Sequence, residues 1–106
     1  MTVDIATLFR NDEFITVIAQ NHETGKVLMS GVANREAVRL TFETKTAWFW
    51  SRTRGQLWQK GETSGNLLHV VEAYTDCYGK QLLLQCRPDG PTCHTGEESC
   101  FFTKIL

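Results

Sequence analysis

Short apolar runs separated by turn residues cover most of the chain, and this pattern predicts a strand-rich fold. Residues 14–19 are rich in β-branched and apolar side chains, and a turn at residues 22–26 leads into a second apolar run at residues 27–32. Two such runs around a glycine-containing turn are typical of a β-hairpin. Further strands are expected at residues 47–50, 57–59, 67–74 and 81–87.

One segment has the spacing of a helix. Asn34 is a favourable N-cap, Glu36 follows in the first turn, where the helix dipole favours an acid, and we expect the helix to end near Thr44. One face of this helix would carry Ala37, Val38, Thr41 and Phe42. The pattern therefore predicts an α+β fold, strand-rich with one main helix.

The composition is that of an ordinary globular domain: 42% of the 106 residues are hydrophobic, 22% are charged, and no linker-like stretch divides residues 1–106. The net charge of −1 argues against a strongly basic protein that coats nucleic acid. No apolar run approaches the ~20 residues of a membrane span, and residues 1–10 lack the pattern of a secretory leader. We therefore expect a single-domain cytoplasmic protein without membrane or nucleic-acid partners, whose cysteines are thiols or metal ligands.

Three of the four cysteines are candidate metal ligands. Cys93 and Cys100 are separated by six residues, and Cys77 lies sixteen residues before Cys93, at the end of an expected strand. Three thiolates can hold a zinc ion and leave its fourth position open for a water molecule. The same spacing fits separate, unconnected thiols equally well. Cys86 alternates with Leu82 and Leu84 along one strand face, which is typical of a core thiol.

The three histidines differ in their setting. His94 directly follows Cys93, and because adjacent residues rarely both reach one tetrahedral ion, a role beside the metal or as a general base is favoured over ligation. The alternative is an exposed loop histidine. His69 falls within an expected strand and is interpreted as structural, and His22 falls in a turn and is expected to be exposed.

Residues 50–66 combine glycines, cations and hydroxyls in a pattern suited to an anion. Arg52 and Arg54 offer forked donors that suit phosphate, and Gly61 and Gly65 allow backbone N–H groups to form a concave nest. Further donors are Lys60, Thr63 and Ser64. Taken alone, the segment is equally compatible with a solvated hairpin whose tryptophans belong to the core.

Six stretches form an ordered set of motifs: Thr24–Met29, Trp50–Gly55, Leu57–Asn66, Asp76–Cys77, Gly90–Gly96 and Ser99–Phe102. In this order they resemble the phosphoribosyl-AMP cyclohydrolase family of histidine biosynthesis, over nearly the whole chain. The run at residues 57–65 and the Cys-His-Thr-Gly sequence at residues 93–96 are specific motifs.

The resemblance implies a zinc hydrolase that acts on a small nucleotide, phosphoribosyl-AMP, and opens its adenine ring at the N1–C6 bond. It also implies an intertwined, domain-swapped homodimer whose zinc is held by cysteines from both subunits, corresponding to Cys77, Cys93 and Cys100. His94 corresponds to the histidine implicated in catalysis. We expect the substrate to be held by Arg52, Arg54, Lys60, Gly61, Glu62, Thr63, Ser64 and Gly65.

One motif departs from the family pattern. Where the family has Asp-Cys-Asp-x-Asp, with carboxylates that bind magnesium, this chain has Asp76-Cys77-Tyr78-Gly79-Lys80. Asp76 is left as the residual magnesium ligand. A hard divalent cation prefers several oxygen ligands, and the positive charge of Lys80 would repel the cation. We therefore expect magnesium to bind weakly or not at all.

This departure leaves two alternatives beside the family reaction. One is a divergent paralogue with an altered substrate or a reduced dependence on magnesium. The other is a non-catalytic, zinc-stabilised nucleotide-binding module. Turnover of phosphoribosyl-AMP with zinc, measured with and without magnesium, distinguishes them.

Overall fold

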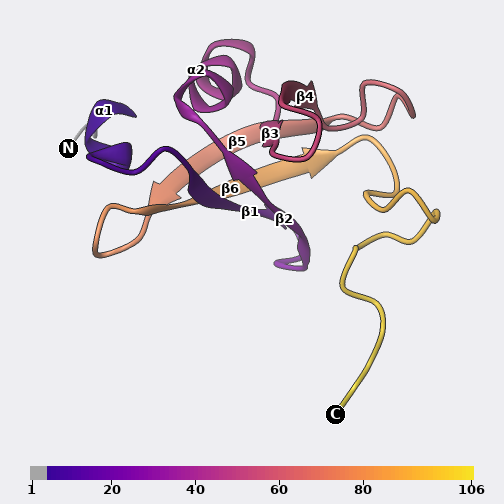
Figure 1. The fold of residues 1–106 in the computed structure, drawn as a ribbon. Helices are drawn as coiled ribbons and strands as arrows, with labels where there is room; N and C mark the ends of the chain where they lie inside the picture. Colours follow the sequence, from indigo (N-terminus) through magenta and orange to yellow (C-terminus); the bar gives the residue numbers. More distant parts are fainter. Residues whose placement is uncertain (1–4) are drawn as a thin grey trace.

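The computed structural model describes residues 5–106 and has an α+β fold (Figure 1). Its elements are α1 (Ile5–Phe9), β1 (Ile15–Asn21), β2 (Val27–Ala33), α2 (Arg35–Thr44), β3 (Trp48–Ser51), β4 (Gln56–Gln59), β5 (Leu68–Thr75) and β6 (Gln81–Pro88). The prediction of a strand-rich fold with one main helix is confirmed. The short helix α1 was not predicted by the sequence pattern.

Four strands form one sheet in the order β2-β1-β6-β5, and β3 and β4 form a separate antiparallel pair. The β1–β2 pair is an antiparallel hairpin, as predicted, and β5 and β6 also pair antiparallel, whereas β1 and β6 lie parallel. Because β1 and β6 run in the same direction, both end at one edge of the sheet. The β5–β6 turn lies at the opposite edge (Figure 1).

The hydrophobic core lies on one face of this sheet. Alternate residues of β1 and β6 are buried there, among them Val17, Leu84 and Cys86, so the interpretation of Cys86 as a core thiol is confirmed. Helix α2 packs against β2, β3 and β4. The fully buried ring of Phe49 in β3 stacks on Trp58 in β4, with centroids 5.1 Å apart. The β3–β4 hairpin is thereby joined to the core.

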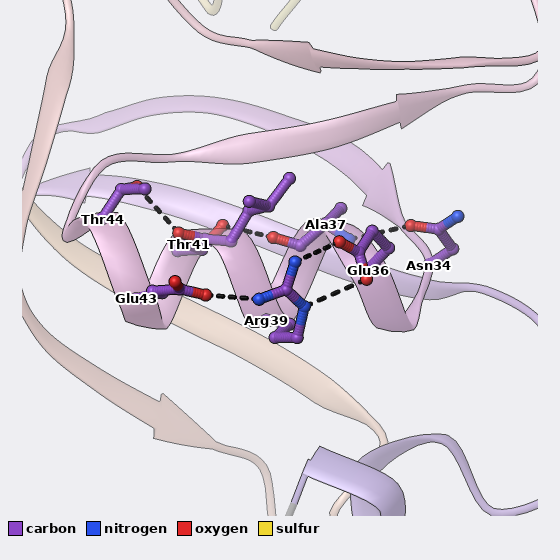
Figure 2. A network of polar contacts seen from close by, with 8 residues as sticks. Asn34, Glu36, Ala37, Arg39, Thr41, Glu43 and Thr44 are labelled. Atoms are coloured by element: carbon purple, nitrogen blue, oxygen red, sulfur yellow. Dashed lines mark hydrogen bonds and ion pairs between the residues drawn. The ribbon is translucent and has the colours of Figure 1, made fainter.

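Helix α2 begins and ends where the sequence predicts. The backbone N–H of Ala37 donates to Asn34 Oδ1 (2.9 Å), and Lys45 follows Thr44 in the left-handed conformation. The buried Thr41 hydroxyl accepts a hydrogen bond from the backbone N–H of Trp48 (2.9 Å), which ties the helix to β3. Figure 2 shows the N-cap and the exposed ion pairs of Arg39 on this helix.

The chain after β6 is irregular and crosses to the start of β2. Ser99 Oγ donates to the carbonyl of Val27 (2.6 Å), and the backbone N–H of Cys100 donates to the carbonyl of Leu28 (2.8 Å). Ser99 is 2% exposed, so this attachment is buried. Beyond it the chain runs away from the sheet (Figure 1). Over residues 5–106, no helix is long and apolar enough to cross a membrane.

Candidate functional site

A cavity of about 360 Å³ lies between the loop after β4 and the irregular segment after β6. The loop contributes Lys60, Glu62 and Ser64 to its wall, and the later segment contributes Cys93 and His94. Residues some 30 positions apart in the sequence therefore surround one space. This places most of the predicted substrate segment beside Cys93, one of the three predicted zinc ligands.

The predicted substrate residues are not all in the cavity wall. Those that line it are Arg54, Lys60, Gly61, Glu62, Thr63 and Ser64. Arg52, exposed in the β3–β4 turn, and Gly65 do not line it. The roles of these side chains in substrate binding stay predictions.

The loop after β4 is tightly folded around Gly61. Its φ is +92°, and a Cβ on this residue would lie 2.3 Å from the carbonyl oxygen of Asn66. The backbone N–H of Gly65 donates to the carbonyl of Gly61 (2.8 Å), which closes the loop. Only glycine combines this left-handed conformation with so close an approach of backbone to backbone.

Asn66 joins the loop to the segment after β6, a role that the sequence did not reveal. Its Nδ2 donates to the carbonyl of Pro91 (3.5 Å), and a Cβ on Gly90 would lie 2.7 Å from its Oδ1. Asn66 also lines the cavity. The available signal was its place at the end of the stretch Leu57–Asn66, one of the six that carry the family resemblance. Asn66 therefore helps to set the width of the cavity.

The Cys93 thiol lies in an electropositive, hydrogen-bonding environment. Cys93 is 9% exposed, and Thr95 Oγ1 donates to its Sγ (3.1 Å). That hydrogen bond lowers the pKa of Cys93, and the neighbouring Cys100 thiol and the positive charge of Lys60 lower it further. The pKa of Cys100 is raised, first by burial and then by its neighbour Cys93. The two thiols lie together, and all four cysteines are free of disulfides.

His94 lies at the mouth of the same cavity. Its side chain is exposed, and its Nδ1 is 4.0 Å from Cys93 Sγ. The ring is therefore within reach of a group bound in the cavity and could exchange protons with it. The catalytic role of His94 stays a prediction.

Trp58 and the two other histidines, His69 and His22, differ in their surroundings. Trp58 stacks on Phe49, in agreement with the interpretation that it belongs to the core, and it also lines the cavity. His69 lies in β5, and its Nε2 is 2.9 Å from an oxygen of Asp89, in agreement with a structural role. His22 is half-exposed in the β1–β2 turn, 4.0 Å from Glu72.

Cys77 is exposed in the β5–β6 turn, far from the other two candidate ligands. Strand β6 has eight residues and spans about 23 Å between this turn and the segment that carries Cys93. Within residues 5–106 of one chain, no group of three His, Cys, Asp or Glu side chains is placed to hold a metal ion. The three cysteines can share an ion only if Cys77 comes from a second copy of the chain.

Fold and cavity together define a small α+β protein with a cavity of about 360 Å³ beside paired thiols, and comparison with known proteins gives its family. Residues 29–102 match the family model of phosphoribosyl-AMP cyclohydrolase. This chain belongs to the phosphoribosyl-AMP cyclohydrolase family.

Curated relatives are identical to this chain at about half of the aligned residues. The phosphoribosyl-AMP cyclohydrolase of Methanothermobacter thermautotrophicus is 46% identical over 107 residues, covering 97% of this chain and 78% of the relative. That of Clostridium botulinum strain 657 is 45% identical over 97 residues, covering 92% of this chain and 88% of the relative. The chloroplastic histidine biosynthesis bifunctional protein of Arabidopsis thaliana is 50% identical over 89 residues, and the match covers 84% of this chain but only 32% of that protein.

Proposed function

We propose that this chain is a phosphoribosyl-AMP cyclohydrolase of histidine biosynthesis that opens the adenine ring of its substrate by hydrolysis of the N1–C6 bond. The observation that carries the proposal is the single cavity shared by Cys93, His94 and the loop at residues 60–64. Relatives of this name cover most of the chain at 45–46% identity. The cavity can admit part of a nucleotide, and its wall offers donors for phosphate.

The donor set fits a zinc ion. Cys93 and Cys100 lie together, and the hydrogen bond from Thr95 and the charge of Lys60 favour the thiolate form of Cys93 that metal binding needs. Cys77 of a second copy would complete a set of three thiolates, so the proposal includes a homodimer. When bound, zinc in such a site supplies a water molecule that is activated near neutral pH.

In the proposed reaction, residues of the chain carry out the proton transfer and the binding of the substrate. In this proposal His94, which lines the cavity, takes a proton from the attacking water and delivers it to ring nitrogen N1 as the N1–C6 bond breaks. The water oxygen stays on C6 as the oxygen of a carboxamide, one proton of the water stays on N1, and the other goes to the exocyclic N6, which becomes the NH2 of the carboxamide, so the atoms balance. Arg54, Lys60 and Ser64 line the cavity, and the proposal assigns to them the binding of the phosphate groups, which holds the ring in position.

The experiment is an absorbance assay of ring opening with zinc-loaded protein and phosphoribosyl-AMP. We expect turnover by the wild type and its loss in His94→Ala, with the zinc content unchanged. His22→Ala, which removes a histidine that does not line the cavity, is the matched control and should keep full activity. A zinc-loaded wild type that binds the nucleotide without opening the ring would refute the proposed function, and an active His94→Ala would refute the role of His94 alone.

A second candidate is a cyclohydrolase with a reduced need for magnesium. The observation that favours it is the β5–β6 turn, where Tyr78 and Lys80 stand in place of the family's carboxylates. Activity assayed with zinc and without added magnesium tests it directly.

A further inference from the structure

The turn between β5 and β6, residues 76–81, is closed by the side chain of Asp76. Its Oδ1 accepts hydrogen bonds from the backbone N–H groups of Lys80 (2.8 Å) and Gln81 (3.1 Å). Its Oδ2 accepts a hydrogen bond from Nε2 of Gln81 (3.2 Å). The backbone N–H of Gly79 donates to the carbonyl of Asp76 (2.9 Å). Both carboxylate oxygens are therefore engaged within their own turn.

A magnesium ion does not fit this turn. Magnesium requires near-octahedral oxygen coordination, usually with one or two carboxylates, and the oxygens of Asp76 already accept hydrogen bonds from its own turn. Tyr78 and Gly79 offer no carboxylate, and Lys80 adds a positive charge. A guanidinium nitrogen of Arg10 also lies close, 3.8 Å from the position that a Cβ on Gly79 would take. The surroundings are thus cationic where a divalent cation would need anions.

The hydrogen bonds to Asp76 have a direct consequence for the next residue, Cys77. They fix residues 80 and 81 relative to residue 76, so the backbone on both sides of the exposed thiol is held.

We infer that Asp76 is a positioning residue: its carboxylate, rather than a divalent cation, orders the turn that presents Cys77 to the metal site of a second copy. The inference rests on the proposed function only in assigning Cys77 to that site. A metal ligand is held in place by the hydrogen bonds around it, and loss of such a support weakens metal binding without removing the ligand itself.

The first test follows the number of thiolates on cobalt, used in place of zinc. Cobalt bound to thiolates absorbs in the near ultraviolet, and the intensity rises with the number of thiolates. We expect Asp76→Ala to lower this absorption toward that of Cys77→Ser, which keeps two thiolates, and to weaken cobalt affinity by about tenfold or more. Asp76→Asn should restore most of the absorption and of the cobalt affinity, because its amide oxygen can still accept hydrogen bonds from the two backbone N–H groups.

The matched control is Glu23→Ala, which removes an exposed carboxylate from the β1–β2 turn. It should leave both the absorption and the affinity unchanged. A wild-type cobalt spectrum and affinity in Asp76→Ala would overturn the inference. Since circular dichroism reports folding separately, an unfolded Asp76→Ala is recognised as such, and the comparison then rests on Asp76→Asn and on the second test.

The second test uses the wild type and magnesium alone. We expect no calorimetric signal from millimolar magnesium and no change in hydrogen exchange at the amides of Lys80 and Gln81. Micromolar magnesium binding that Asp76→Ala abolishes would overturn the inference. Neither test requires turnover, so a protein that binds cobalt through three thiolates and fails to open phosphoribosyl-AMP would refute the proposed function and leave this inference standing.

Discussion

At the scale of single residues, the buried hydroxyl of Thr92 is without a hydrogen-bond partner among the residues that the structure describes. Thr92 is 3% exposed and belongs to the cavity wall. Because an unpaired buried hydroxyl costs free energy, we expect Thr92→Val to raise the free energy of unfolding by about 1 kcal/mol. Thr92→Ser keeps the hydroxyl and is the control. Urea denaturation measures both, and a destabilised Thr92→Val would contradict the prediction.

The buried thiol of Cys86 makes the free energy of unfolding depend on pH in the alkaline range. Burial raises the pKa of its thiol from 9.0 to about 12. The unfolded chain therefore releases this proton at a lower pH than the folded chain. The contribution of the Cys86 thiol to the free energy of unfolding is complete below about pH 9 and is lost as the pH rises toward 12. The contribution is at most about 1.4 kcal/mol per pH unit.

Urea denaturation over this pH range, compared between wild type and Cys86→Ala, isolates that effect. The variant loses packing at every pH, but its free energy of unfolding should fall less steeply with rising pH. In metal-free protein, Cys77→Ala, which removes an exposed thiol, should keep the wild-type slope. Equal slopes in wild type and Cys86→Ala would count against the burial argument.

Residues whose environment is local were predictable, and residues whose partners are distant were not. Alternation along one strand identified Cys86 as a core residue, and the N-cap preference identified Asn34. Asn66 contacts Pro91, 25 positions away, so no local pattern reveals its contact. The lack of a partner for Thr92 is likewise a property of the packed structure.

At the scale of elements, the loop after β4 offers a matched pair of glycines. Gly61 and Gly65 both have positive φ, at +92° and +84°. A Cβ on Gly61 would meet the carbonyl of Asn66 at 2.3 Å, whereas a Cβ on Gly65 meets nothing within 4 Å. Both alanine variants carry the cost of a left-handed residue, about 1 kcal/mol, but only Gly61→Ala must displace backbone.

We therefore expect Gly65→Ala to lose about 1 kcal/mol of stability and Gly61→Ala to lose about 2 kcal/mol or more. Since Asn66 joins the loop to the far wall of the cavity, Gly61→Ala should also raise the KM for phosphoribosyl-AMP the more strongly of the two. Thermal unfolding and steady-state kinetics measure these effects. Equal effects of the two substitutions would show that the close approach at Gly61 is unimportant.

The elements that the sequence predicts are those with their own local signal. The β1–β2 and β5–β6 hairpins have turn residues between apolar runs, and α2 has an N-cap and a helical face. Helix α1 has only five residues and depends on the packing of Leu8 and Phe9, since so short a helix is unstable alone. The parallel pairing of β1 with β6 joins residues 65 positions apart, and no turn signals it.

At the scale of the whole molecule, the parallel pair determines where the candidate ligands lie. Since β1 and β6 end at the same edge, the start of β2 and the segment after β6 meet there, and Cys100 is held against Leu28 beside Cys93. Cys77 lies at the opposite edge, at the far end of β6. The sequence motifs identified the candidate ligands, but only the sheet topology shows that one chain cannot bring them together.

A mixture of two inactive variants tests whether the three cysteine ligands come from two copies of the chain. Cys77→Ser and Cys93→Ser should each lack the complete ligand set and show little activity. In a dimer of one chain of each kind, one site takes Cys77 from the Cys93→Ser chain and takes Cys93 and Cys100 from its partner, so it is intact. Because half of randomly assembled dimers are mixed and each has one intact site of two, refolding the variants together should restore roughly a quarter of wild-type activity and zinc content.

The matched control mixes Cys93→Ser with Cys100→Ser. These two cysteines must come from the same chain, because they lie together within one fold, and neither variant chain carries both. No mixed dimer then has a complete site, and activity should stay at the level of the separate variants. Recovery in this control, or none in the first mixture when mass spectrometry detects mixed dimers, would mean that the three thiols are not divided between two copies in this way.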